Sequence, residues 1–133
     1  MNAEAFFDTN VLLHLLTKDE KKAARSEELL SFGGVISVQV LNEFASVASK
    51  KYKMQWPQIR QTLSALRANL AIVPVTLDVH EHGMALIELH KFAVYDGMIV
   101  AAALLAGCKT LYSEDMHDGL VIKGLNIKNP YAF

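Results

Sequence analysis

Acidic residues stand at several points where a strand or a helix is predicted to begin or end. Asp8 directly follows the apolar run "AEAFF", Asp96 opens a strongly apolar helix, and Glu114, Asp115 and Asp118 follow the stretch "TLYS". An unpaired buried carboxylate is costly, and neighbouring carboxylates raise one another's pKa. A divalent cation removes both problems, and all-oxygen carboxylate ligands suit Mg²⁺ or Mn²⁺ rather than zinc. The acids therefore predict a site for such an ion.

Glu43 lies within a predicted amphipathic helix over residues 38–52. At 100° per residue, the apolar arc of this helix is centred near Phe44. Glu43 falls just past Val47 at the shoulder of that arc, beside Lys50. A glutamate at this position can reach along the edge of the protein into a cleft.

Each acid also has a purely structural interpretation. Asp8 in "DTN" could form an Asx turn, and Asp96 could complement a helix dipole. "SEDMHDG" could be a polar surface loop, and Glu43 could pair with Lys50 on a solvated flank. Taken together, these interpretations are less convincing, because a parallel sheet brings the carboxyl ends of its strands to one edge, where ligands of open α/β sheets bind.

The elements that must position these acids alternate along the chain. We expect strands at residues 3–7, 35–37, 70–75, 110–113 and 124–128. We expect helices at residues 11–17 (capped by Thr9 or Asn10), 19–32, 38–52, 56–68, 77–92 (capped by Thr76) and 95–107. This rhythm predicts a single α/β domain over residues 1–133, an α/β/α sandwich with a parallel sheet joined by right-handed crossovers.

Composition bounds the class of protein. The chain has 133 residues, 52% hydrophobic and 20% charged, which is one domain's length and argues against disorder. Cys108 is the single cysteine, so a disulfide within the chain is excluded and a cytoplasmic location is expected. We expect neither a signal peptide nor a membrane span, since the longest uncharged apolar run, residues 98–108, is too short. The net charge of −1 argues against a strongly basic nucleic-acid clamp.

Four stretches in order resemble the PIN-domain family, and within it the small VapC-type toxin ribonucleases. They are "FFDTN", "SVQVLNEF", "YDGMIVAAA" and "LYSED". The resemblance implies a parallel sheet in the order 3-2-1-4-5 with helices on both sides. It also implies an acidic pocket that holds Mg²⁺ or Mn²⁺ and the metal-dependent cleavage of single-stranded RNA. A partner antitoxin protein and a homodimer are further implications.

By matching position, the resemblance makes Asp8, Glu43, Asp96 and Asp115 the catalytic quartet. Asp8 and Asp96 would bind metal directly, Asp115 directly or through water, and Glu43 would orient or deprotonate the attacking water. Supporting hydrogen bonds are expected from Thr9, Asn10 and Ser113. Asp118 is the alternative to Asp115 as the fourth acid, and a site with one ion or two is compatible with the sequence.

Several other signals carry less weight. Lys50, Lys51, Lys53, Arg60 and Arg67 are candidates to grip RNA but are more readily explained as solvated helix faces. Trp56 and Tyr95 could stack on bases, although a core or helix-interface position is expected for each. His80 and His82 would point to different faces of a helix, so a zinc site there is disfavoured and both should face solvent. His117 lies near the acids and could touch substrate, but a surface role is expected.

Two other protein classes compete with the nuclease. A signalling receiver domain would need an aspartate after the third strand, where this chain has "VPVT". A catalytically inactive PIN-like module that binds RNA or protein is the remaining alternative. The complete acid set disfavours it.

Overall fold

The strands form one sheet at the centre of the computed structural model, which describes residues 3–133. The sheet has six strands in the order β3-β2-β1-β4-β6-β5. Their bounds are β1 Ala5–Phe7, β2 Val35–Ser37, β3 Ala71–Val73, β4 Thr110–Tyr112, β5 Val121–Ile122 and β6 Leu125–Lys128. Every neighbouring pair is parallel except β5 and β6, which are antiparallel.

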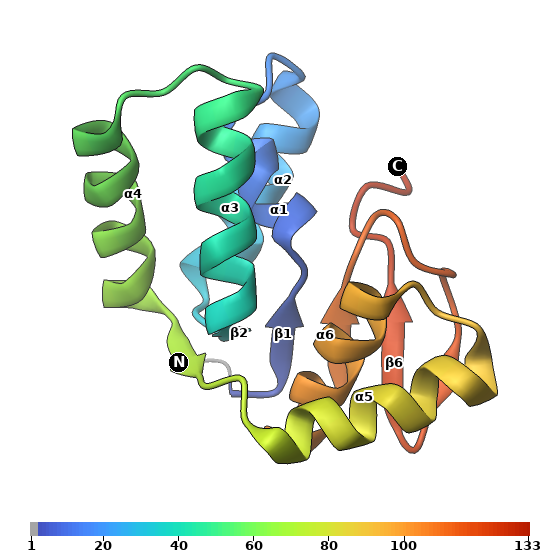
Figure 1. Cartoon of the computed structure of the whole chain (residues 1–133). Coiled ribbons are helices and arrows are strands. Elements are labelled where there is room, and N and C mark those ends of the chain that lie inside the picture. The colour runs from blue at the N-terminus through green and yellow to red at the C-terminus, as the bar shows by residue number, and fades with distance from the viewer. Residues whose placement is uncertain (1–2) are drawn as a thin grey trace.

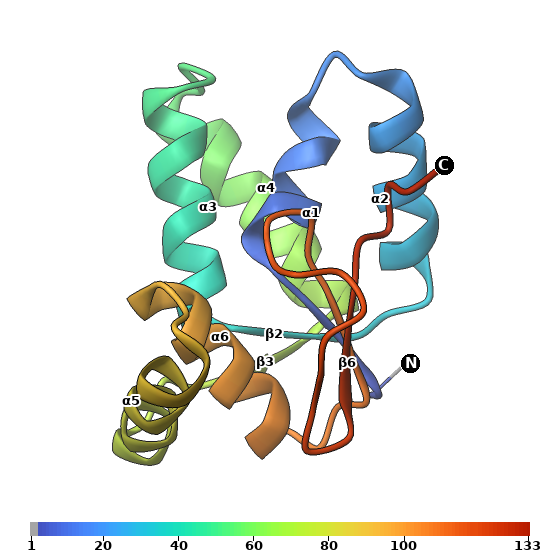
Figure 2. The same ribbon diagram turned by 90° about the vertical axis from the view of Figure 1, so that its right-hand side faces the viewer.

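Helices cover both faces of this sheet. Their bounds are α1 Thr9–Leu13, the 3₁₀ helix η1 His14–Leu16, α2 Glu20–Ser31, α3 Val38–Lys50, α4 Trp56–Asn69, α5 Leu77–His90 and α6 Val94–Leu105. Figure 1 shows α3 and α4 side by side, and Figure 2 shows α1 to α4 on one side of the strands with α5 and α6 on the other. This is the layered α/β/α arrangement that alternation of strands and helices predicts.

The predicted strand order is confirmed, with one addition. The predicted fifth strand, 124–128, corresponds to β6 and lies beside β4. The sequence prediction missed β5, which pairs with β6 through a tight turn at Lys123 and Gly124, both with positive φ. Two residues are too few to show the alternation by which a strand is recognised, so the wholly parallel sheet was an incomplete prediction.

The central strands are short but almost completely buried. Phe6, Ile36, Leu111 and Ile127 each have 0% of their surface exposed. A parallel sheet with helices on both faces is dry on both sides, which explains why these strands are apolar without alternation. The polar side chains that follow the strands are therefore the first groups beyond the core.

Side-chain caps begin the helices next to the sheet. Asp8, rather than the predicted Thr9 or Asn10, is the N-cap of α1, and its carboxylate accepts a hydrogen bond from the Thr9 backbone N–H. Ser37 caps α3, and Thr76 caps α5 as predicted. A side-chain oxygen at the N-cap satisfies a backbone donor that the helix leaves free.

Helices α5 and α6 pack closely because each contributes a glycine to the contact. A Cβ atom at Gly83 would lie 2.6 Å from Met98 Sδ, and one at Gly97 would overlap Ile87 Cγ1. Only hydrogen fits at these positions. Gly97 directly follows Asp96, so this helix contact fixes where the Asp96 backbone lies.

Candidate active site

Asp8 is the most buried acid of the predicted set, with 5% of its surface exposed. Its carboxylate accepts hydrogen bonds from Thr9 N at 2.7 Å, Ser113 Oγ at 2.7 Å and Asn10 Nδ2 at 3.3 Å. Burial raises the pKa of Asp8 to about 6, against the lowering effect of the bonds from Ser113 and Thr9. The charges of Asp96 and Glu43 raise this pKa further.

Glu43 reaches the same place from helix α3. One carboxylate oxygen accepts a hydrogen bond from Thr9 Oγ1 at 3.1 Å, and the other accepts from Gln39 Nε2 at 2.7 Å. Glu43 therefore bonds to the residue that follows Asp8 in the chain, and not to Lys50. Gln39, which also donates to the Tyr95 backbone carbonyl, was missed in the sequence, although its spacing of four residues from Glu43 puts both on one helix face.

Asp96 lies in the first turn of α6 and is half-buried. Burial raises its pKa, and the charges of Asp115 and Glu43 raise it further. Its carboxylate takes part in no hydrogen bond or ion pair with residues 3–133. Asp96 is thus close enough to Asp115 and Glu43 for their charges to act on it.

Asn10 connects Asp8 to the loop that follows β4. Its Nδ2 donates to Asp115 Oδ2 at 3.2 Å and lies 3.4 Å from Ser113 Oγ, while its Oδ1 accepts from the Glu114 backbone N–H at 3.1 Å. This loop lies beside α1 in Figure 2. Asn10 and Ser113 therefore hold Asp8 and the loop in one polar network.

The three crowded acids of this loop have separate environments. Asp115 is exposed and accepts a hydrogen bond from Asn10. Its charge also raises the pKa of Asp96. Asp118 is also exposed, but its carboxylate accepts from the Asn129 backbone N–H at 2.8 Å. Glu114 pairs with Lys22 and with His14; burial acts to raise its pKa, but the bonds from these two partners outweigh it and the pKa is lowered. Geometry thus favours Asp115 over Asp118 as the acid next to Asp96.

The chemistry of this donor set fits a hard divalent cation. Asp8 follows β1, Glu43 lies within α3, Asp96 lies in the first turn of α6 and Asp115 follows β4, and within residues 3–133 none of the four forms an ion pair. In the described part of the chain, however, no three acidic, histidine or cysteine side chains are already arranged to hold a metal ion. The residue types and the absence of ion pairs fit Mg²⁺ or Mn²⁺.

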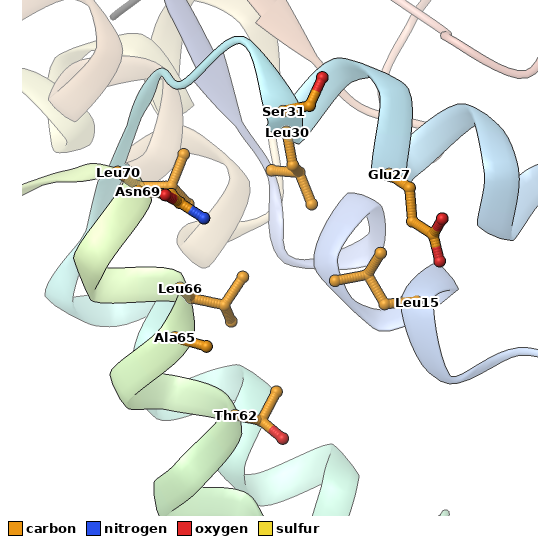
Figure 3. A pocket seen from close by; sticks show the side chains of 9 residues that line it. All are labelled: Leu15, Glu27, Leu30, Ser31, Thr62, Ala65, Leu66, Asn69 and Leu70. Carbon is orange, nitrogen blue, oxygen red and sulfur yellow. The ribbon is translucent and has the colours of Figure 1, made fainter.

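One cavity of the described chain is lined by acids of the candidate site, whereas another is not. A cleft of about 410 Å³ is lined by Asp96 and Asp115 together with residues of the α5–α6 turn and of the segment 116–120. A second cavity of about 310 Å³ lies between α2 and α4 and has an apolar lining that includes Leu30, Leu66 and Leu70 (Figure 3). Its only carboxylate is Glu27, so it is separate from the acid cluster.

The expectations for the aromatic and histidine residues had mixed outcomes. Trp56 and Tyr95 are 60% and 67% exposed, so the expected core or helix-interface positions were wrong. Each sits in the first turn of its helix, where side chains can point past the packed face. His80 and His82 are exposed as expected, and His117 lies on the surface.

The protein is an α/β/α sandwich with the strand order β3-β2-β1-β4-β6-β5 and with acidic residues near the carboxyl ends of its parallel strands. The PIN domain model matches residues 5–117, and the chain therefore belongs to the PIN-domain family. In a toxin–antitoxin complex from Klebsiella pneumoniae, a similar chain has 29% sequence identity and a TM-score of 0.75, with 97% of this chain and 99% of that chain covered.

More distant solved structures share the fold. VapC20 from Mycobacterium tuberculosis, described as a sarcin–ricin loop cleaving toxin, is 16% identical with a TM-score of 0.63, covering 80% of this chain and 86% of that chain. A DNA-bound VapBC from Salmonella typhimurium gives 19% identity and a TM-score of 0.67 over 96% and 98% of the two chains. A search of curated proteins finds no match. The chain is thus structurally similar to VapC toxins.

Proposed function

We propose that this protein is a Mg²⁺- or Mn²⁺-dependent endoribonuclease that hydrolyses phosphodiester bonds of single-stranded RNA. The observation that carries the proposal is the buried Asp8 carboxylate, coupled to Glu43 and Asp96 without any cationic partner in the described chain. A fold gains nothing in stability from such an arrangement. A bound divalent ion compensates it and creates a reactive site.

The four acids have different roles in this proposal. Asp8 and Asp96 would hold the ion directly, and Asp115 would hold it directly or through water. The ion would supply a lowered pKa for nearby water and stabilisation of negative charge on the phosphate. Glu43, held by Thr9 and Gln39, accepts the proton of the attacking water or orients that water.

Supporting side chains hold the acids in place before the ion arrives. The hydrogen bonds from Ser113 and Thr9 fix the Asp8 carboxylate, and Asn10 ties it to Asp115. Such contacts orient ligands and typically change metal affinity or activity by about 10- to 100-fold when removed. Asp96 has no such contact in residues 3–133, so it is the acid that rotates on binding.

We further propose that the protein is the toxin of a toxin–antitoxin pair and acts in the cytoplasm. The similar Klebsiella pneumoniae chain, whose whole length this chain nearly matches, comes from a toxin–antitoxin complex. Among the described helices, none qualifies as a membrane span. An antitoxin protein would cover the acid pocket or a groove beside it.

The proposal includes a homodimer. Leu77 and Leu89 of α5 are each 72% exposed, and pairing with a second copy would remove such apolar surface from water. Sedimentation of the native protein and of Leu77→Asp tests this point. A native protein that stays monomeric at high concentration would contradict it.

The decisive test of the activity uses purified protein with structured and unstructured RNAs in Mg²⁺, Mn²⁺ or EDTA. Cleavage of unstructured RNA should require a divalent ion and should disappear in Asp8→Asn and in Asp96→Asn. Cleavage that survives EDTA or both substitutions would refute the mechanism. RNA binding without any cleavage would instead favour a catalytically inactive PIN-like module.

A further inference from the structure

The cleft beside Asp96 and Asp115 contains two aromatic rings that the proposed chemistry does not use. His90 is the last residue of α5, and Phe92 lies between α5 and α6. Figure 1 shows the turn that joins these two helices. Their ring centroids are 5.7 Å apart with an interplanar angle of 45°. Both residues line the cleft of about 410 Å³, a volume within the range of roughly 300 to 1,000 Å³ usual for small-ligand sites.

Apolar and cationic groups complete the lining. Met116 is buried and Leu120 half-buried, so they give the cleft an apolar surface. Lys91 is exposed, carries a positive charge and is the C-cap of α5 with a φ of 62°, while His117 adds an exposed imidazole on the segment that follows Asp115. The cleft therefore combines flat rings, apolar surface and positive charge directly beside the acids.

We propose that this cleft holds the base of the nucleotide next to the scissile phosphodiester, stacked on Phe92 and His90. Lys91 then faces a backbone phosphate of the same strand. Bases of single-stranded RNA stack on aromatic and imidazole side chains, and a neighbouring cation holds the backbone. This inference rests on the proposed ribonuclease function and assigns to it a base-binding subsite.

Other surfaces of the described chain fit this role less well. The apolar cavity between α2 and α4 has no aromatic ring and no contact with the acid cluster (Figure 3). Trp56 and Tyr95 are exposed but do not line the cleft. A base in the cleft lies beside Asp96 and Asp115, which is where the nucleotide flanking the cut must be.

Binding of RNA can be measured separately from cleavage. The probe is a short single-stranded RNA with one 2-aminopurine base, whose fluorescence is quenched by stacking. The parent protein carries Asp8→Asn and is kept in EDTA, so the RNA is not cut. Phe92→Leu removes the ring, Phe92→Tyr restores one, and Phe32→Leu is the matched control because Phe32 is 65% exposed and lies outside the cleft.

We expect the parent to quench the probe and Phe92→Leu to weaken binding about tenfold, since stacking on one side chain contributes at about this level. Phe92→Tyr should bind like the parent, and so should Phe32→Leu. Because Phe92 also packs against the core, thermal unfolding is recorded for each variant. If Phe92→Leu does not fold, His90→Gln in the folded background provides the comparison and should also weaken binding.

Three results would overturn the subsite: no quenching by the parent, equal affinity of Phe92→Leu and the parent, or equal weakening by Phe32→Leu. Binding of an arginine-containing peptide in the cleft without any response to RNA would assign the cleft to a protein partner. Failure of the native protein to cleave RNA in Mg²⁺ or Mn²⁺, with quenching by the Asp8→Asn parent intact, would refute only the ribonuclease. Quenching lost while cleavage persists would refute only the subsite.

Discussion

Replacing Asp8 by asparagine should make the metal-free protein more stable at neutral pH. Burial raises the pKa of Asp8 from 3.8 to about 6, which corresponds to about 3 kcal/mol of unfavourable free energy for the ionised, folded state. The folded state binds the extra proton between about pH 4 and pH 6, so this group lowers stability as the pH rises through that window. Above pH 6 the whole penalty is present.

Asparagine removes the charge but keeps part of the hydrogen bonding. The amide oxygen of the asparagine can still accept a hydrogen bond from the Thr9 backbone N–H. Its amide nitrogen cannot accept the hydrogen bonds that Ser113 and Asn10 donate to the Asp8 carboxylate. Losing one such bond costs about 1 kcal/mol. We therefore expect Asp8→Asn to gain about 1 to 2 kcal/mol at pH 8 without metal, and to lose that gain or become less stable than the native protein at pH 4.5.

Urea unfolding followed by circular dichroism at both pH values measures this difference. Asp118→Asn is the control, because Asp118 is exposed and its replacement should give no gain at pH 8. Saturating Mg²⁺ or Mn²⁺ should then stabilise the native protein and not Asp8→Asn. An Asp8→Asn variant that is destabilised equally at pH 4.5 and pH 8 would refute the claim that a buried, uncompensated charge is held there.

Three further predictions follow from the geometry of the site. Asp115→Asn should lower RNA cleavage at least about 100-fold, whereas Asp118→Asn should retain it; the reverse result would assign the fourth acid to Asp118. Gly97→Ala should lower the free energy of unfolding by about 1 to 3 kcal/mol and weaken Mn²⁺ binding, because the added methyl overlaps Ile87. Urea unfolding measures the first effect and calorimetry the second. Unchanged stability and unchanged Mn²⁺ affinity would contradict the close packing of α5 and α6. Glu114→Gln should lower the free energy of unfolding by roughly 0.5 to 1 kcal/mol at pH 7 and by progressively less as the pH falls below about 4.5. The reason is that a carboxylate with a lowered pKa stabilises the fold only while it is ionised. A loss in urea unfolding that does not change with pH would contradict this.

Much of the fold follows from local sequence pattern. The strand at 35–37 has the predicted bounds, and the apolar run before Asp8 ends in the sheet as expected. The alternation of strands and helices fixes the layers, and the strand order came with the family resemblance. The two-residue strand β5 could not be predicted, because its position depends on pairing with β6 rather than on its own pattern.

The sequence predicts where the candidate acids lie in the fold better than it predicts all of their hydrogen-bond and ion-pair partners. The alternation of strands and helices predicts a parallel sheet, and such a sheet brings acids at the carboxyl ends of its strands to one edge. A supporting bond from Asn10 was expected, but the pairing of Glu114 with Lys22 and His14 joins residues far apart in the chain and gives no local signal. Phe92 gives no local signal, since only the α5–α6 turn brings its ring to the cleft beside Asp96.

The central claim is that separate carboxylates share one divalent-ion site. Isothermal titration with Mn²⁺, paired with paramagnetic broadening of NMR signals, tests it without any substrate. We predict saturable binding to the native protein, loss of binding in Asp8→Asn and in Asp96→Asn, and binding retained in Asp118→Asn. Absence of saturable binding, or binding that persists with Asp8 and Asp96 both replaced, would contradict the claim.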